Sequence, residues 1–152
     1  MPHVPGPGEL ALDFTLPSTD GDITLSERLA QRAVLLVFYP GDDTPVCTRQ
    51  LCDYRDNLKT FSDLAVDVLA INSQSLESHQ RFAKRHALPF PLLSDADKTV
   101  CRSYGAVGLL GTTKRVLVLI DREGRIRWRC SDLPIFRRSA EEIREVISEL
   151  RL

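Results

Sequence analysis

The sequence FYPGDDTPVCTRQLCDYRD, residues 38–56, joins the end of an apolar run to a segment with helical periodicity. The run that leads into it, residues 33–39, is continuously apolar with β-branched and aromatic members, which is the pattern of a strand covered on both faces. Pro40 interrupts the run. From about Cys47, apolar residues recur at the spacing of one helix face, at Leu51, Tyr54, Leu58 and Phe61. We therefore predict a buried strand, a turn, and then a helix that begins with a cysteine.

Strands and helices alternate along the rest of the chain. The further predicted elements are two short extended pieces around Asp20-Gly21, a buried strand at 64–71, a helix at 75–86, a short strand at 92–93, a helix that Ser94 or Asp95 caps and that ends at Gly105, a hairpin around 122–124, and a last helix with the capping box Ser139–Glu142. This order predicts right-handed parallel crossovers followed by antiparallel strands. We expect a mixed central sheet flanked by helices on both faces.

The position of residues 38–56 in such a sheet makes them a candidate site. Ligands tend to bind at the carboxyl ends of the strands in sheets of this kind. The quoted segment follows the carboxyl end of the first buried strand. Position alone therefore points to this segment before its chemistry is considered.

Size and composition indicate a globular protein of one domain. The chain has 152 residues, of which 43% are hydrophobic and 27% charged, enough for a core of its own. We expect a single domain over residues 1–152. Residues 1–8 hold three prolines and two glycines and are predicted to form a loose N-terminal arm.

Charge and hydropathy exclude several classes of partner. The formal net charge is -1, so no global field recruits nucleic acid or an anionic membrane. Arg125, Arg127 and Arg129 alternate along a predicted strand, which indicates a solvated face rather than a phosphate-binding stripe. No apolar run reaches the length of a membrane span, and the N-terminus lacks the pattern of a secretory signal. We expect a cytoplasmic protein, whose four cysteines are free, catalytic or metal-bound rather than a disulfide framework.

Cys47 lies at the first turn of the predicted helix. A helix N-terminus offers unpaired backbone N–H groups and a partial positive charge, and both favour a thiolate. The thiolate is the nucleophilic form of cysteine, so a helix start is the place where a reactive cysteine is stabilised most in that form. The alternative is a small buried apolar side chain, which is common for free cysteine.

Cys52 lies five positions after Cys47. In an α-helix this spacing places two residues about 140° apart around the axis, with Cα atoms roughly 8 to 9 Å apart. A disulfide cannot span that distance without backbone movement. The spacing predicts two thiols that stay reduced in the resting fold and join only if the first helical turns unwind.

Other uses of the cysteines remain open from the residues alone. A structural zinc site would need two more ligands, and Cys101 and Cys130 are available, but neither has knuckle-like spacing. We expect these two to be structural or incidental thiols. A hydrolase pairing of Cys47 with His86 is compatible with the sequence, although no motif supports it.

The segment also resembles a known family. Pro40-x-x-x-Thr44-x-x-Cys47 matches the active-site signature of the peroxiredoxins, and the longer string looks like the Q-type branch, the bacterioferritin comigratory proteins. In many of that branch a resolving cysteine lies five positions after the peroxidatic one, as Cys52 does here. The resemblance covers nearly the whole chain, through GELALDFTLPSTDGDITLSE, FPLLSDADKTVCRSYGA and TKRVLVLIDREGRIRW. It implies a thioredoxin-like fold of the α/β class.

The resemblance implies a role for each site residue. Cys47 is the peroxidatic nucleophile and Cys52 the resolving cysteine. The Thr44 hydroxyl holds the Cys47 sulfur and the peroxide oxygen in line, and Pro40 shields the nascent sulfenic acid from water. Arg115 stabilises the thiolate and polarises the peroxide.

Two positions depart from the pattern of the branch. Val46 stands where glycine is common, and Gln50 stands where glutamate is common. The first makes the approach to the nucleophilic cysteine bulkier, and the second removes a carboxylate partner for an active-site arginine. Neither removes a group that the reaction requires.

The implied function is a thiol-dependent peroxidase for hydrogen peroxide and alkyl hydroperoxides, without metal, haem or flavin. Its partners are the peroxide and thioredoxin or a similar dithiol reductant, and we expect a monomer that binds neither nucleic acid nor membrane. Two alternatives are a thioredoxin-fold protein disulfide oxidoreductase, against which the lack of C-x-x-C argues, and a non-enzymatic redox sensor or holdase.

Overall fold

The computed structural model describes residues 3–132 and 138–152. Its strands are β1 (Thr15–Leu16), β2 (Ile23–Thr24), β3 (Ala33–Phe38), β4 (Val66–Asn72), β5 (Leu92–Ser94), β6 (Arg115–Ile120) and β7 (Ile126–Asp132). Its helices are α1 (Leu25–Leu29), α2 (Pro45–Asp56), α3 (Leu58–Asp63), α4 (Leu76–His86), α5 (Thr99–Ser103) and α6 (Ala140–Leu150). In this part of the chain no helix is both long enough and apolar enough to cross a membrane.

The sheet is mixed, as predicted. Its strands lie in the order β5-β4-β3-β6-β7, and β1 and β2 form a separate two-stranded sheet. β3 pairs with β4 in parallel, β4 with β5 in parallel, and β3 with β6 and β6 with β7 antiparallel. The parallel half follows from the strand–helix alternation, and the antiparallel half from the hairpin at residues 122–124.

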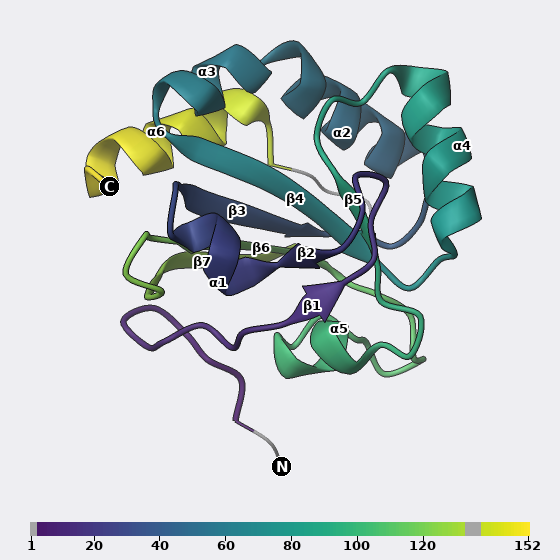
Figure 1. The fold of residues 1–152 in the computed structure, drawn as a ribbon, viewed down its shortest axis with the longest axis horizontal. Coiled ribbons are helices and arrows are strands. Elements are labelled where there is room, and N and C mark those ends of the chain that lie inside the picture. The colour runs from purple at the N-terminus through teal and green to yellow at the C-terminus, as the bar shows by residue number, and fades with distance from the viewer. Residues whose placement is uncertain (1–2, 133–137) are drawn as a thin grey trace.

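Helices cover both faces of the sheet (Figure 1). One core cluster joins the sheet to α2, α3, α4 and α6, and a second joins it to α1, α5 and the segment around β1 and β2. β3 lies in the centre, and all six of its residues are buried. Leu35 and Val37 enter the first cluster, while Leu36 and Phe38 enter the second. This two-sided burial is the physical reason for the continuous apolar run.

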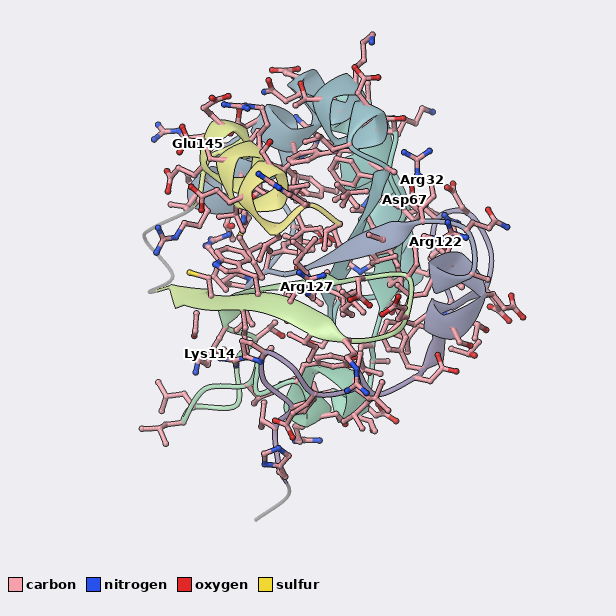
Figure 2. The ribbon with its side chains drawn as sticks, turned by 90° about the vertical axis from the view of Figure 1, so that its left-hand side faces the viewer. Arg32, Asp67, Lys114, Arg122, Arg127 and Glu145 are labelled. Atoms are coloured by element: carbon pink, nitrogen blue, oxygen red, sulfur yellow. The ribbon has the colours of Figure 1, made fainter. Side chains whose placement is uncertain are left out.

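Strand register brings two distant segments to one end of the sheet. Phe38, the last residue of β3, pairs with Val116, so Arg115 at the start of β6 lies beside the loop that leaves β3. Figure 2 shows Lys114, which precedes β6, and Arg122, which follows it, at opposite ends of the sheet. The end that Lys114 marks therefore carries the candidate site.

Helical structure after β3 is divided, although the apolar spacing runs through without a break. Asn57 separates α2 from α3, with φ -113° and ψ 16°. Its side-chain Nδ2 donates to the Asp53 carbonyl at 2.8 Å. An asparagine side chain that bonds the backbone in this way competes with the helical ladder, which explains why the helix ends there.

The helix expected after β5 begins later than Ser94 or Asp95. Lys98 has a left-handed backbone, with φ 62°, and this breaks the helical path, so α5 begins at Thr99. Asp95 still satisfies the helix start from a distance, because its Oδ2 accepts from the Cys101 N–H at 2.7 Å. Lys98, and not Ser94 or Asp95, is the N-cap of α5, so the predicted cap and the predicted boundary were both wrong.

The arginines of β7 do not share one solvated face. A register irregularity between Leu119 and Ile120 interrupts the alternation of side chains along β7. Arg127, labelled in Figure 2, donates to the Leu150 carbonyl of α6, whereas Arg129 donates to the Tyr104 carbonyl after α5. The two side chains therefore reach opposite faces of the sheet, and the expectation of one wet face was wrong.

The predicted capping box of α6 is present and supplies a stability test. The Ser139 hydroxyl accepts from the Glu142 N–H, and the Glu142 side chain returns to the Ser139 backbone. Ser139→Ala removes this cap and should lower the free energy of unfolding by about 1 kcal/mol, measured by urea denaturation. Ser148→Ala, an exposed position in the same helix, is the matched control and should not destabilise. Equal effects of the two changes would contradict the capping role.

Candidate active site

Cys47 is the third residue of α2 and lies inside the protein. Thr44 is the N-cap, and Pro45 occupies the first helical position, where its missing N–H is no loss. The Cys47 side chain is 1% exposed and packs in the core cluster that also holds Tyr39 and Leu51. The sulfur therefore combines burial with the positive end of a helix.

Arg115 faces this sulfur directly. Its Nη2 lies 3.1 Å from Cys47 Sγ, and the residue is 1% exposed. A buried guanidinium stays charged and needs compensation by negative charge or by acceptors. A thiolate at Cys47 supplies negative charge at that point, so the contact favours the nucleophilic form of the cysteine.

Gln50 completes the contact from the next turn of α2. Its Oε1 accepts from Arg115 Nη1, and its own Nε2 lies 3.1 Å from the Tyr54 hydroxyl. Tyr54 in turn donates to the Arg138 carbonyl at 2.8 Å. From the sequence, Gln50 was predicted only to depart from the family pattern and was not predicted to be a site residue. Its position three residues after Cys47 was the available signal, because residues at that spacing share a helix face.

Compared with a glutamate at position 50, the amide of Gln50 carries no negative charge but still accepts the hydrogen bond from Arg115. A glutamate would compete with the thiolate for the charge of Arg115, whereas the neutral Gln50 offers an acceptor without a counter-charge. The site therefore keeps an acceptor for Arg115 at this position without adding negative charge. More of the positive potential remains available to the sulfur.

Thr44 and Pro40 flank the approach to α2. Thr44 is exposed and Pro40 half-buried. The Thr44 Oγ1 donates to the Gly41 carbonyl at 3.2 Å, so in this conformation the hydroxyl closes the loop rather than contacting the sulfur. The structure thus joins Arg115 to Cys47 by direct contact and places Thr44 one turn before the cysteine.

Cys52 shares α2 with Cys47 but not its environment. Cys47 and Cys52 form no disulfide here, and Cys52 is half-buried. Since α2 is continuous from Pro45 to Asp56, the two thiols lie on different sides of an intact helix. This agrees with the expectation from spacing that they do not bond in the resting fold.

The part of α2 after Cys52 is anchored to α6. The Asp53 Oδ2 accepts from the Ala140 N–H at 2.7 Å, at the N-terminal end of α6. A carboxylate is stabilised there by free N–H groups and by the helix dipole. The bond from Tyr54 to the Arg138 carbonyl lies beside it. These contacts hold the second half of α2 independently of its first turns.

Neither the zinc site nor the hydrolase pair is assembled. Cys47 and Cys101 belong to core clusters on opposite faces of the sheet, so the four cysteines cannot converge on one ion. His86 packs edge-on against Phe82, with ring centroids 5.1 Å apart, and its Nε2 faces Asp43 at 3.9 Å. It is therefore turned toward a loop carboxylate and not toward Cys47.

Comparison with known proteins assigns this arrangement to a family. A family model described as the AhpC/TSA family matches residues 7–129, which is well over half of the chain. The chain belongs to the AhpC/TSA family.

Individual relatives are peroxiredoxins. The chain is 41% identical over 126 residues to a putative peroxiredoxin bcp of Coxiella burnetii, with 78% of this chain and 83% of that protein covered. It is 41% identical over 127 residues to peroxiredoxin Bcp of Escherichia coli K12, with 78% and 81% covered. The crystal structure of peroxidoxin BcpB from Mycobacterium tuberculosis superposes with a TM-score of 0.84 at 30% identity, covering 98% of this chain and 97% of that one.

These matches confirm the predicted family and the predicted thioredoxin-like fold. Peroxiredoxins are thiol-dependent peroxidases, and this member of the AhpC/TSA family is therefore a thiol-dependent peroxidase. The resemblance to the bacterioferritin comigratory branch rested on residues 38–56, and the relatives named Bcp bear it out.

The remaining cysteines of this peroxiredoxin lie in different surroundings. Cys101 is fully buried in α5. Burial, the hydrogen bond to Asp95 and the charge of that carboxylate together raise the pKa of the Cys101 thiol far above its ordinary value. Cys130 is half-buried and pairs with Leu117 across β6 and β7. It shares a strand face with Trp128, as the spacing predicted.

Cys101 should be unreactive in the native protein because its raised pKa keeps it as a neutral thiol. Treatment with iodoacetamide at pH 7.5, followed by peptide mapping, should leave Cys101 unmodified while the half-buried Cys52 is alkylated in the same sample. After denaturation both should react. Labelling of native Cys101 as fast as Cys52 would show that this thiol is accessible and ionised.

Proposed function

We propose that this peroxidase reduces hydrogen peroxide and alkyl hydroperoxides with Cys47 as the nucleophile. The observation that carries the proposal is the 3.1 Å contact from Arg115 Nη2 to Cys47 Sγ at the start of α2. It combines a buried thiol, a fixed positive charge and a helix N-terminus. All three favour a thiolate placed to attack an electrophilic oxygen.

In the first step the Cys47 thiolate attacks one peroxide oxygen in line with the O–O bond. A sulfur–oxygen bond forms, the O–O bond breaks, and the departing oxygen leaves as water or alcohol after taking up a proton. Donors aimed at that oxygen lower the barrier. Arg115, the first-turn N–H groups of α2 at Val46 and Cys47, and the Thr44 hydroxyl after release from the Gly41 carbonyl can supply them. Pro40 shields the sulfenic acid that results.

In the second step Cys52 condenses with the sulfenic acid, which forms the disulfide and releases water. The first turns of α2 must unwind for the two sulfur atoms to meet. Support comes from the contacts of Asp53 with Ala140 and of Tyr54 with Arg138, because these begin immediately after Cys52. The earlier turns can then unwind once the contacts of Arg115 with Cys47 and Gln50 are released. A thioredoxin-type dithiol then reduces the disulfide by exchange.

We place this cycle in the cytoplasm, where a dithiol reductant is available, and assign it to a monomer. Both assignments follow the resemblance to Q-type peroxiredoxins. A general protein disulfide oxidoreductase and a holdase are the competing functions. Rapid repeated turnover with peroxide and thioredoxin would distinguish the proposed enzyme from both.

Variants of the two cysteines test the proposed roles. Cys47→Ser should abolish peroxide consumption coupled to NADPH through thioredoxin and its reductase. Cys52→Ser should retain the first reaction with peroxide but lose steady turnover on thioredoxin, because no intramolecular disulfide forms. Full turnover of the Cys47 variant would overturn the proposed nucleophile. Normal cycling of the Cys52 variant would overturn its role as resolver.

Removal of Arg115 should slow the first step. Arg115→Met keeps the aliphatic volume but removes the charge beside the sulfur, and the loss of one such donor lowers rates by about 10² to 10³. Stopped-flow measurement of the second-order rate constant with hydrogen peroxide gives the value directly. Arg81→Met on the exposed surface of α4 is the control and should leave the rate unchanged. An unaltered rate in the Arg115 variant, with its fold intact, would exclude the assigned role.

A further inference from the structure

A buried carboxylate lies in the loop that carries the peroxide-site residues. Asp42 stands between Pro40 and Thr44, in the connection from β3 to α2, and is 8% exposed. Acidic side chains are rarely buried unless they are paired. None of the roles assigned above uses this residue, so its burial calls for an explanation.

Both carboxylate oxygens of Asp42 accept hydrogen bonds from fixed donors. Oδ1 accepts from the Tyr39 hydroxyl at 2.6 Å, and Oδ2 accepts from the Ser78 hydroxyl at 2.7 Å and from His79 Nδ1 at 2.8 Å. The backbone N–H of Asp42 also donates to the Gln74 side chain. Ser78 and His79 belong to α4 and Gln74 to the turn before it, so the loop is docked onto the start of that helix.

His79 faces an acceptor on each side. The ring is 0% exposed, with Nδ1 2.8 Å from Asp42 Oδ2 and Nε2 3.0 Å from the Leu93 carbonyl oxygen. A carbonyl has no proton to donate, so Nε2 must carry one. An ionised carboxylate likewise requires a proton on Nδ1. Both bonds are satisfied together only by the imidazolium form.

The ionisation of Asp42 agrees with this assignment. Burial alone would raise its pKa, but the hydrogen bonds from His79, Tyr39 and Ser78, together with the charge of His79, lower it below the ordinary value. The pair therefore stabilises the fold above the ordinary pKa range of a carboxylate. The contribution of the ionised Asp42 is lost as the pH falls through the lowered value.

The other groups around the ring do not replace Asp42. Tyr39, the residue after β3, has its ring centroid 6.4 Å from that of His79. Burial and the charge of Asp42 raise the pKa of Tyr39 well above its ordinary value, so it remains a neutral donor. β5 contributes the Leu93 carbonyl, and α4 contributes Ser78. The nearby charges of Arg85 and Asp43 pair with each other at 2.8 Å on the surface.

We infer that Asp42 and His79 form a buried charged pair that positions the loop from Pro40 to Thr44 for the reaction at Cys47. His79 is then a positioning residue, which acts through Asp42 and never touches the peroxide. This inference rests on the proposed function. Asp42 lies two residues from Thr44 and five from Cys47, so its displacement shifts the hydroxyl and the first turn of α2 together. Misplacement of such groups by about 1 Å can slow a reaction about 10²-fold.

Two substitutions of His79 separate the Asp42 contact from the loss of the ring. The amide of asparagine falls near Nδ1 of a histidine and that of glutamine near Nε2. His79→Asn therefore keeps a donor toward Asp42, while His79→Gln keeps only the donor toward Leu93. The second-order rate constant with hydrogen peroxide should fall more in His79→Gln, by about tenfold or more, than in His79→Asn. The reverse order, or equal loss, would overturn the inference.

The pH dependence of Asp42→Asn tests the charge. With asparagine at position 42, the imidazolium loses its counter-charge, whereas a neutral His79 can accept at Nδ1 from the new amide. The peroxide rate of Asp42→Asn divided by that of the wild type should therefore be higher at pH 8.5 than at pH 5.5. The ratio should stay flat for the double variant Asp42→Asn/His79→Gln. A flat ratio in the single variant would show that His79 carries no charge that affects the peroxide rate.

A matched surface pair supplies the control. Arg85→Gln breaks the contact to Asp43, which joins the same loop to the same helix but leaves both side chains exposed. Exposed ion pairs contribute little to stability, so this change should not displace the loop, and the peroxide rate should be unchanged. A fall as large as that of His79→Gln would show that any loop–α4 contact suffices, which contradicts a specific role for the buried pair.

Hydrogen exchange distinguishes failure of this inference from failure of the proposed function. In His79→Gln the amides of residues 41–44 should exchange faster than in the wild type and in Arg85→Gln, whatever substrate the enzyme uses. If the amides exchange faster in His79→Gln but the wild type has no peroxide activity, the proposed function is wrong and the positioning role stands. Unchanged exchange in a folded His79→Gln protein would sink the positioning role alone.

Discussion

A positive charge inside the protein constrains the whole site. Arg115 is almost fully buried and places Nη2 3.1 Å from the Cys47 sulfur. Withdrawing a guanidinium from water is costly unless negative charge or acceptors replace the solvent. A thiolate at Cys47 would supply negative charge, and Gln50 adds an acceptor without competing for the charge. The arrangement that stabilises the buried arginine is thus the one that favours a thiolate at Cys47.

Helix α2 is attached to the rest of the protein on both sides of its cysteines. Before the helix, Asp42 is bonded to Tyr39, Ser78 and His79. After Cys52, Asp53 and Tyr54 are bonded to the start of α6. The first turn of a helix has N–H groups without intrahelical partners, and local opening favours segments with few anchoring contacts. The segment between the two anchors contains both cysteines and is itself held by Arg115 at Cys47 and Gln50, so the proposed unwinding must break these contacts.

Much of the fold could be predicted from local pattern. The apolar run of β3, the helix predicted at residues 75–86 and the capping box of α6 are local signals, and the structure confirms each. The predicted helix boundaries were wrong where a single side chain or backbone angle interrupted a helix that the apolar spacing predicts. Asn57 ends α2 by bonding to the Asp53 carbonyl, and Lys98 delays α5 through its left-handed backbone. Such events depend on geometry that apolar spacing does not record.

The sequence by itself predicted a reactive cysteine, and it determined the position of Cys47 at a helix start and its separation from Cys52 along an intact helix. These follow from spacing along one segment, because helix geometry converts residue number into distance. Only the tertiary structure decided what surrounds the thiol. Strand register brings Arg115 to Cys47 from 68 positions away in the chain, and the docking of α4 sets His79 against Asp42. Contacts between distant segments depend on how the sheet is ordered, and no local pattern records that order.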